Sequence, residues 1–306
     1  MDGTTSRPGL RDVVHALTRL HKDRLTPGLP TGSHRTGAAE LHGLEQLEQQ
    51  FLDDERACVI GAAATAPDDA DAFCAWFDRL RERGPGQGNS FWPWLATSAT
   101  AAQLRWVLQQ ERVVEAGFDD VVALTSVRMP LVAKLEMARN HWDELGRGRM
   151  ATVHAPFLRE LEVAFGVDDD DGAVVEEAGA LPALMLSLAS NHRRFAFHAI
   201  GAIGVVELTQ PARARAINAA LERLSVSGKD RRYYAIHATL GVAHAASWSR
   251  EVLRPLVAGD ARRARAIAEG ALMRLRGGSR CVNRYRRVLG LNRVESQLDV
   301  DVSDTT

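Results

Sequence analysis

The stretch AIGAIGVVE, from Ala199 to Glu207, decides the fold of this chain. Its first eight residues are apolar or glycine, and the apolar character extends over Leu181 to Leu208 without the alternation that marks a strand. This pattern predicts a long helix, broken near Asn191, that is buried on all sides. A helix without a polar face needs other helices around it, so the sequence predicts a helical bundle.

The rest of the chain also favours an all-α fold. Alternating runs of Val, Ile, Thr and aromatic residues are nearly absent, and apolar residues recur at helical spacing. Thr209-Gln210-Pro211 predicts a helix stop, with proline at the first position of a new helix. The expected helices cover 10–25, about 37–55, 67–83, 100–111, 130–146, 154–165, 181–208, 211–228 and 229–246, and two more follow to about Leu289.

The chain shows no internal repeat, and its predicted organisation is one main bundle with additions at both ends. We expect residues 1–99 to form an N-terminal helical extension packed on the core. Residues 100–290 would form the main bundle. The polar residues 291–306 would form a flexible tail.

Composition narrows the class of protein. The chain has 306 residues, a formal net charge of −1 and 45% hydrophobic residues, which is typical of a globular protein and unlike a general nucleic-acid binder. The sequence predicts no signal peptide, because the opening MDGTTSRPGL has no apolar core. It also predicts no membrane span, because the apolar run from Ala199 stops at Glu207. Cys58, Cys74 and Cys281 share no metal-ligand spacing. Because three is an odd number and the cysteines form no disulfide framework, we expect a reducing compartment, and the cytoplasm by default.

Polar groups inside apolar helices are the first candidates for chemistry, because an unpaired buried charge is costly. Glu207 ends the apolar stretch, and His237 and His244 lie seven residues apart in an apolar segment. Two helical turns place both rings on one face, as an inward metal site requires. The alternatives are a glutamate that reaches solvent at a helix end and two hydrogen-bonded core histidines.

Glu144 and His154 form a second candidate pair. On a straight helix they would lie about 15 Å apart along the axis, so they can share a metal only if the helix breaks between them. Gly146 and Gly148 supply places for such a break. The alternative is a helix–loop–helix joint that carries surface charges.

With Gln110-Glu111, these segments resemble the haem-oxygenase-like di-iron oxidases, also called iron-containing redox enzymes, over roughly residues 100–280. In that family a glutamate precedes the motif His-x-x-x-Asp-x-x-His by about thirty residues. Glu207 stands thirty residues before His237, and His244 occupies the matching place. The resemblance implies a haem-oxygenase-like bundle that binds iron through Glu111, Glu144, His154, Glu207, His237 and His244. Glu115, one turn after Glu111, is the alternative first ligand.

The chain departs from the family pattern at Gly241, where the family has aspartate. Glycine offers no side-chain ligand, and it leaves room for a water, a substrate group or a closely packed helix. Loss of one carboxylate should weaken one of the two metal positions. The resemblance therefore implies Fe(II), with one or two ions per chain.

The resemblance also implies an activity. It indicates an iron-dependent oxidase or oxygenase that uses dioxygen on a small amino- or carboxylate-bearing metabolite, in natural-product biosynthesis. An electron donor and a homodimer stay open as partners, while the balanced charge and the lack of a spanning apolar run argue against nucleic acid and membrane as partners. Arginine can bind a substrate carboxylate in bidentate fashion, although surface charges are the simpler interpretation of these residues. The candidates are Arg193, Arg194, Arg231 and Arg232.

Two other functions compete with this prediction. A degenerate, non-catalytic relative would keep the fold and act as a partner or scaffold protein, which Gly241 favours. The intact set of six polar residues argues against it, because a protein without a metal has no need for so many inward polar groups. A metal-free hydrolase would need a nucleophile, and neither Cys58 nor Cys74 lies beside a suitable base in the sequence.

Overall fold

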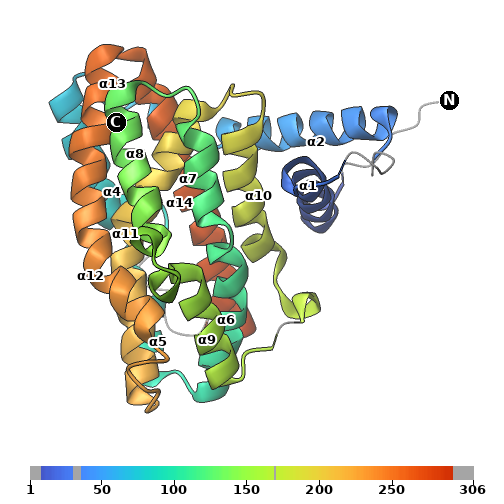
Figure 1. Cartoon of the computed structure of the whole chain (residues 1–306), viewed down its shortest axis with the longest axis vertical. Helices are drawn as coiled ribbons and strands as arrows, with labels where there is room; N and C mark the ends of the chain where they lie inside the picture. The colour runs from blue at the N-terminus through green and yellow to red at the C-terminus, as the bar shows by residue number, and fades with distance from the viewer. Residues whose placement is uncertain (1–7, 30–35, 169, 292–306) are drawn as a thin grey trace, which may run out of the picture.

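The computed structural model of the chain describes residues 8–29, 36–168 and 170–291 (Figure 1). These residues form helices and no strand, which confirms the all-α prediction. The helices are α1 (Leu10–Leu25), α2 (Ala38–Ala57), α3 (Ile60–Ala63), α4 (Ala70–Arg83), α5 (Phe91–Ser98), α6 (Ala101–Glu115), α7 (Phe118–Ser126), α8 (Leu131–Glu144), α9 (His154–Phe165), α10 (Glu176–Ser190), α11 (Ala196–Arg223), α12 (Arg232–Ser247), α13 (Arg254–Gly259) and α14 (Arg262–Val288). A π-helical segment, Trp248–Leu253, joins α12 to α13.

Helix α11 is the central element of the bundle, and it contains the stretch that decides the fold. Every residue from Ala199 to Leu208 is buried, as predicted. Helices α14, α12 and α5 pack against it. Gly201 and Gly270 allow α11 and α14 to cross closely, because a Cβ on either would lie within 2 Å of a backbone oxygen of the other helix. The centre of the bundle is therefore fixed by backbone-to-backbone contact.

The predicted helix stop at Thr209-Gln210-Pro211 is wrong, because α11 continues through Pro211 to Arg223. Proline removes one backbone hydrogen bond inside a helix, which normally favours a kink or an end. Here both halves are held by packing, since Ile217 and Leu221 beyond the proline are fully buried. Glu207 and the segment after Pro211 therefore share one continuous helix.

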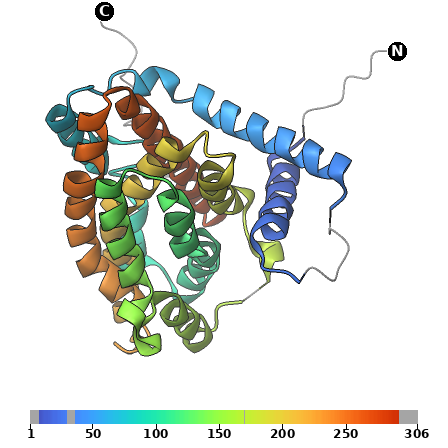
Figure 2. The same cartoon turned by 45° about the horizontal axis from the view of Figure 1, so that its top comes forward.

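The N-terminal helices α1 and α2 extend to one side of the bundle (Figures 1 and 2). They pack on each other and on α10. Glu48 of α2 is completely buried, and its carboxylate oxygens lie 2.9 Å from Nε2 of His21 and 3.0 Å from Nδ2 of Asn191. The domain division at residue 99 stays a prediction. Residues 292–306 of the predicted tail lie outside the described residues.

A second buried carboxylate links the N-terminal helix α2 to the central helices of the bundle. Glu269 of α14 accepts hydrogen bonds from Nε2 of His198 at 3.0 Å and from Nε of Arg56, on α2, at 2.6 Å. Burial alone would raise the pKa of Glu269, but these two donors lower it to about 2. The carboxylate is therefore ionised at neutral pH and holds α2, α11 and α14 together.

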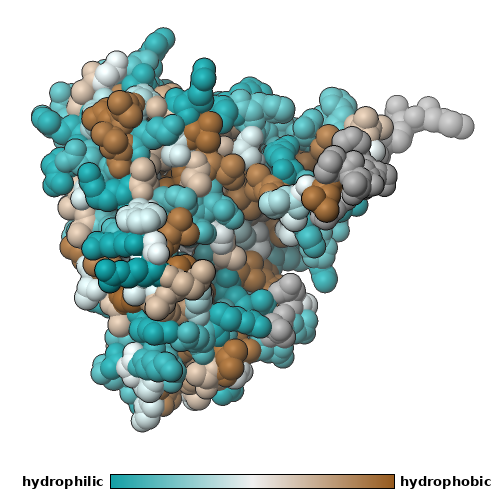
Figure 3. All heavy atoms as spheres, in the orientation of Figure 1, coloured by the Kyte–Doolittle hydropathy of each residue, from teal (hydrophilic) through white to brown (hydrophobic). Residues whose placement is uncertain are grey.

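The face of the molecule in Figure 3 is mostly hydrophilic, with apolar side chains in scattered groups. Within the described ranges, no helix is both long and apolar enough to cross a membrane.

Candidate metal centre

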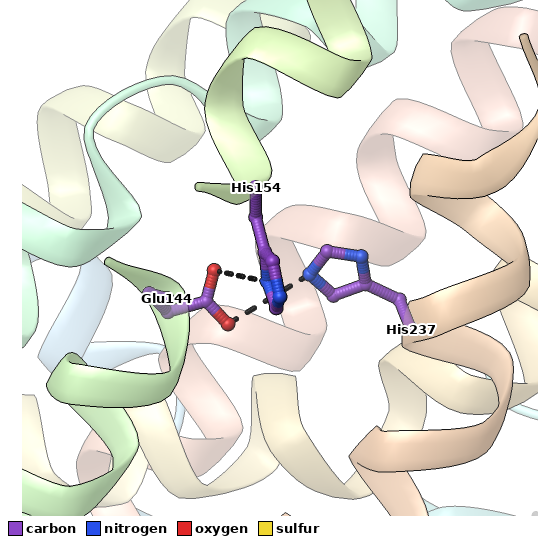
Figure 4. A group of neighbouring side chains, drawn as sticks. All are labelled: Glu144, His154 and His237. Atoms are coloured by element: carbon purple, nitrogen blue, oxygen red, sulfur yellow. Dashed lines mark hydrogen bonds and ion pairs between the residues drawn. The ribbon is translucent and has the colours of Figure 1, made fainter. Parts of the chain in front are cut away.

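Glu144, His154 and His237 converge inside the bundle from three different helices (Figure 4). Each offers one ligand atom, and these three atoms all lie within 4.8 Å of one another. His154 Nδ1 lies 2.9 Å from one carboxylate oxygen of Glu144, and His237 Nε2 lies 3.8 Å from the other. The three side chains are only 8–12% exposed. We call this group the triad.

The interruption of the helix between α8 and α9 brings Glu144 and His154 together, as the sequence predicted. Two short 3₁₀ turns, Gly146–Gly148 and Met150–Thr152, separate the helices. Gly146 has a φ of +62°, and a Cβ there would lie 2.4 Å from the carbonyl carbon of Thr152. A glycine is therefore required at this turn, both for its left-handed backbone and for the close approach.

The ring of His237 is oriented by its own helix. Its Nδ1 donates a hydrogen bond to the backbone oxygen of Tyr233 at 2.8 Å, which directs Nε2 towards Glu144. The Tyr233 hydroxyl in turn donates to Glu115 of α6 at 3.0 Å. Outer hydrogen bonds of this kind fix the tautomer and direction of a metal-binding histidine.

The charge of the triad suits a cation. Burial alone would raise the pKa of Glu144, but hydrogen bonds from His154 and His237 hold that pKa well below its ordinary range. Glu144 is therefore a carboxylate at neutral pH. The same contact raises the pKa of His237, against the effect of burial.

A second polar group lies beside the triad, between α8, α11 and α12. Glu207 is buried, with Oε2 3.5 Å from Nδ1 of His244. The other ring nitrogen of His244 lies 3.2 Å from Asp143. Glu207 also accepts a hydrogen bond from Asn140 Nδ2 at 2.8 Å. Glu207 therefore does not reach solvent at a helix end, which was one interpretation of the sequence. We call these four residues the second group.

The donor set of the triad fits iron. Two imidazoles and one carboxylate with open coordination positions are typical of non-haem Fe(II) oxygenases. The chain matches the model of a protein family described as iron-containing redox enzyme over residues 105–279, which is more than half of its length. The chain belongs to this family. The predicted resemblance and the haem-oxygenase-like bundle are thereby confirmed.

No curated protein matches the chain significantly.

The structure does not bring all six predicted ligands into one group. Glu144, His154 and His237 form the triad, and Glu207 and His244 belong to the second group. Glu111 lies in neither group, and its carboxylate is paired at 2.6 Å with Nη1 of Arg213. The binding of metal by each of the six stays a prediction.

Glu115, unlike Glu111, lines a cavity together with the triad. This cavity, of about 300 Å³, contacts Glu144, His154 and His237. Glu115 is itself bound by Arg213, by Tyr233 and by Nε2 of Gln210 at 3.1 Å. The alternative first ligand thus shares the cavity of the triad but is engaged with three partners.

Gly241 allows a close helix contact. A Cβ at this position would lie 2.8 Å from Cγ of Pro211 on α11. Of the three options that the sequence left open for the space beside Gly241, the structure has the closely packed helix. The glycine and the proline therefore complement each other across the α11–α12 contact.

A larger cavity, of about 580 Å³, is also lined by His154. Its walls combine the apolar side chains of Phe157, Ile236 and Leu240 with three arginines. One of them is Arg232, whose guanidinium lies 3.8 Å from the centre of the Phe157 ring. The other two are Arg147 and Arg149.

The remaining arginines that the sequence singled out have structural partners. Arg193 donates to the backbone oxygens of Leu124 and Thr125, and Arg194 donates to Gln49. Arg231 pairs with Glu222, and Arg232 pairs with Glu160. Among the four candidates, Arg232 is thus the one that lines the cavity beside His154.

Sequence reasoning missed Asp143 and Asn140 as members of the site. Asp143 directly precedes Glu144, and Asn140 lies one turn earlier on the same helix. The signal that could have found Asn140 was its spacing of four residues from Glu144, which places both on one helix face.

Proposed function

We propose that this iron-containing redox enzyme is an iron-dependent, dioxygen-using oxidase or oxygenase. Its substrate would be a small amino- or carboxylate-bearing metabolite, and its role would lie in natural-product biosynthesis. Fe(II) would be held by Glu144, His154 and His237. An electron donor would be a further partner wherever the reaction consumes more electrons than the substrate provides.

One observation carries this proposal. The ligand atoms of two histidines and one carboxylate, from three separate helices, lie within 4.8 Å of one another in a nearly buried position. Buried polar groups need partners, and a bound divalent cation satisfies all three at once.

The iron and the side chains around it would have different roles in the reaction. Ferrous iron with open positions supplies the binding and reduction of dioxygen. Glu144 contributes the negative charge, and Tyr233 orients His237. The apolar walls of the bundle limit the access of water, which strengthens electrostatic interactions inside the site.

The cavity of about 580 Å³ supports the proposed class of substrate. Its volume falls within the usual range for a small-molecule pocket. A guanidinium such as that of Arg232 can bind a carboxylate in bidentate fashion, while Phe157 and Leu240 can contact an apolar part of the same molecule. His154 belongs to the triad and also lines this cavity, so a substrate bound here would be adjacent to the metal.

The alternative function is a non-catalytic partner or scaffold protein. The close contact between Gly241 and Pro211 favours it, because no ligand can enter from that position. This alternative predicts that the protein binds no metal, whereas the oxidase proposal requires it.

Anaerobic reconstitution with ferrous iron separates the two functions. We expect the wild-type protein to retain iron after desalting and to change its absorbance when dioxygen is added. His154→Ala and His237→Ala should each lose the iron while far-UV circular dichroism stays unchanged. His15→Ala, on the exposed face of α1, is the matched control and should retain it. Full iron content in both triad variants would contradict the proposal.

A further inference from the structure

Arg274 of α14 carries a positive charge into the bundle without a direct partner. Its Nε atom is buried and has no hydrogen-bond partner among the described residues. Within the described ranges no carboxylate lies at ion-pair distance from its guanidinium, whereas Arg276, two residues later, lies 3.4 Å from Glu55. Removing an unpaired cation from water is costly, so the surroundings of Arg274 call for a bound group.

A second guanidinium lies near that of Arg274. It belongs to Arg213 of α11, whose side chain is only 15% exposed. Burial lowers the pKa of Arg274, and the positive charge of Arg213 lowers it further. Glu111 and Glu115 of α6 both pair with Arg213 and leave Arg274 without a direct partner among the described residues.

The two arginines line one cavity of about 90 Å³, between α11, α14 and the turn after α4. Among the described residues that line it, none is aspartate or glutamate. Ser279, Gln87 and Trp92 add side chains that can donate hydrogen bonds. A cavity with two cations, further donors and no carboxylate in its walls is suited to an anion.

Close packing fixes the shape of this cavity. Gly86 has a φ of +75°, and a Cβ there would lie 2.8 Å from Cβ of Ser279 on α14. A Cβ at Gly84 would lie 2.6 Å from Cδ1 of Leu275. The turn after α4 therefore lies directly against α14, and the cavity has room for no more than a small ion or a few water molecules.

We propose that this cavity binds a small inorganic anion, such as chloride or nitrate, between the guanidinium groups of Arg213 and Arg274. Guanidinium groups bind anions through several N–H donors at once. The inference does not rest on the proposed function, because no member of the triad lines this cavity. Arg213 connects the two places, since it also pairs with Glu115 in the cavity of the triad.

Thermal unfolding of the purified full-length chain tests this inference without any need for iron or activity. The midpoint is measured in sodium chloride and in sodium gluconate at equal concentration, because gluconate has the same charge and is too large for the cavity. We expect the midpoint of the wild-type protein to be about 2–4 °C higher in chloride, since an ion that binds only the folded chain stabilises it. Equal midpoints in the two salts would overturn the proposal.

Two variants assign the response to Arg274. Arg274→Met should unfold at the same midpoint in both salts, and in gluconate this midpoint should equal or exceed that of the wild type, because no unpaired charge is buried. Arg276→Met, on the same helix, is the matched control and should keep the chloride response, since Glu55 retains Arg280 at 2.8 Å. A chloride response that persists in Arg274→Met would place the anion elsewhere and overturn the proposal.

Bromide locates the anion directly in the wild-type protein, independently of how the variants fold. A crystal grown with bromide in place of chloride should give an anomalous peak at the bromine edge between the guanidinium groups of Arg213 and Arg274. A crystal with bromide bound at other positions and no peak in this cavity would contradict the proposal.

Discussion

Replacement of Gly241 is the change whose effect follows most directly from the structure. A Cβ at this position would lie 2.8 Å from Cγ of Pro211, closer than two carbon atoms normally pack. Overpacking of this kind costs about 1–3 kcal/mol. Removal of a glycine from a helix interior returns at most about 1 kcal/mol. We therefore expect Gly241→Asp to lower the free energy of unfolding by about 1–2 kcal/mol and to leave the number of bound metal ions unchanged.

Urea unfolding of the metal-free protein measures this effect, and a double-mutant cycle assigns its cause. Gly241→Ala should destabilise the wild-type protein. The same change should stabilise a Pro211→Ala variant by up to about 1 kcal/mol, because the proline ring is gone and the helix propensity of alanine remains. An equal effect of Gly241→Ala in both backgrounds would refute the packing argument. A gain of bound iron in Gly241→Asp would show that position 241 is still open to a ligand.

Three further changes have defined outcomes. Glu269→Gln should make the stability less dependent on pH in the acid range. The pKa of Glu269 is lowered to about 2, so its carboxylate contributes stability above pH 4.5 that is lost as the pH falls towards 2. Free energies of unfolding measured across this pH range test the expected loss. Gly146→Ala should weaken iron binding and destabilise the protein by at least about 1 kcal/mol, since φ at this position is +62°. An iron affinity and a free energy of unfolding in urea that both equal those of the wild type would contradict this. Arg213→Met should cost about 3–5 kcal/mol, because it leaves Glu111 buried without its cation, and a thermal midpoint equal to that of the wild type would argue against this pairing.

The helices were predictable where local signals and burial agree. The helix expected at 10–25 is α1, and Thr100 starts α6 with the side chain of Gln103 completing a capping box. The buried helix around Ala199 followed from the length of its apolar run. The short helices α3, α5 and α7 were not predicted, since none of them spans enough residues to show a clear period.

Pro211 marks the limit of local rules. A proline after Thr209-Gln210 normally ends a helix, yet the helix continues because its faces on both sides are buried by other elements. The packing around Pro211 involves residues far away in the sequence, such as Gly241, so no local pattern could reveal it.

The members of the triad were predictable from the spacing of residues along the sequence. The glycines after Glu144 indicated the turn that brings it to His154, and the family pattern pointed to His237. The partners of the predicted residues were not predictable. Arg213 beside Glu111 and Asn140 beside Glu207 depend on how α6, α8 and α11 meet, which requires the folded structure.

The position of iron in a crystal grown anaerobically with Fe(II), located by anomalous scattering at the iron edge, tests whether the triad holds the metal. We predict a strong peak at bonding distance from one oxygen of Glu144, one ring nitrogen of His154 and Nε2 of His237. A fully loaded crystal with no peak between these three side chains, or with its strongest peak elsewhere, would contradict it.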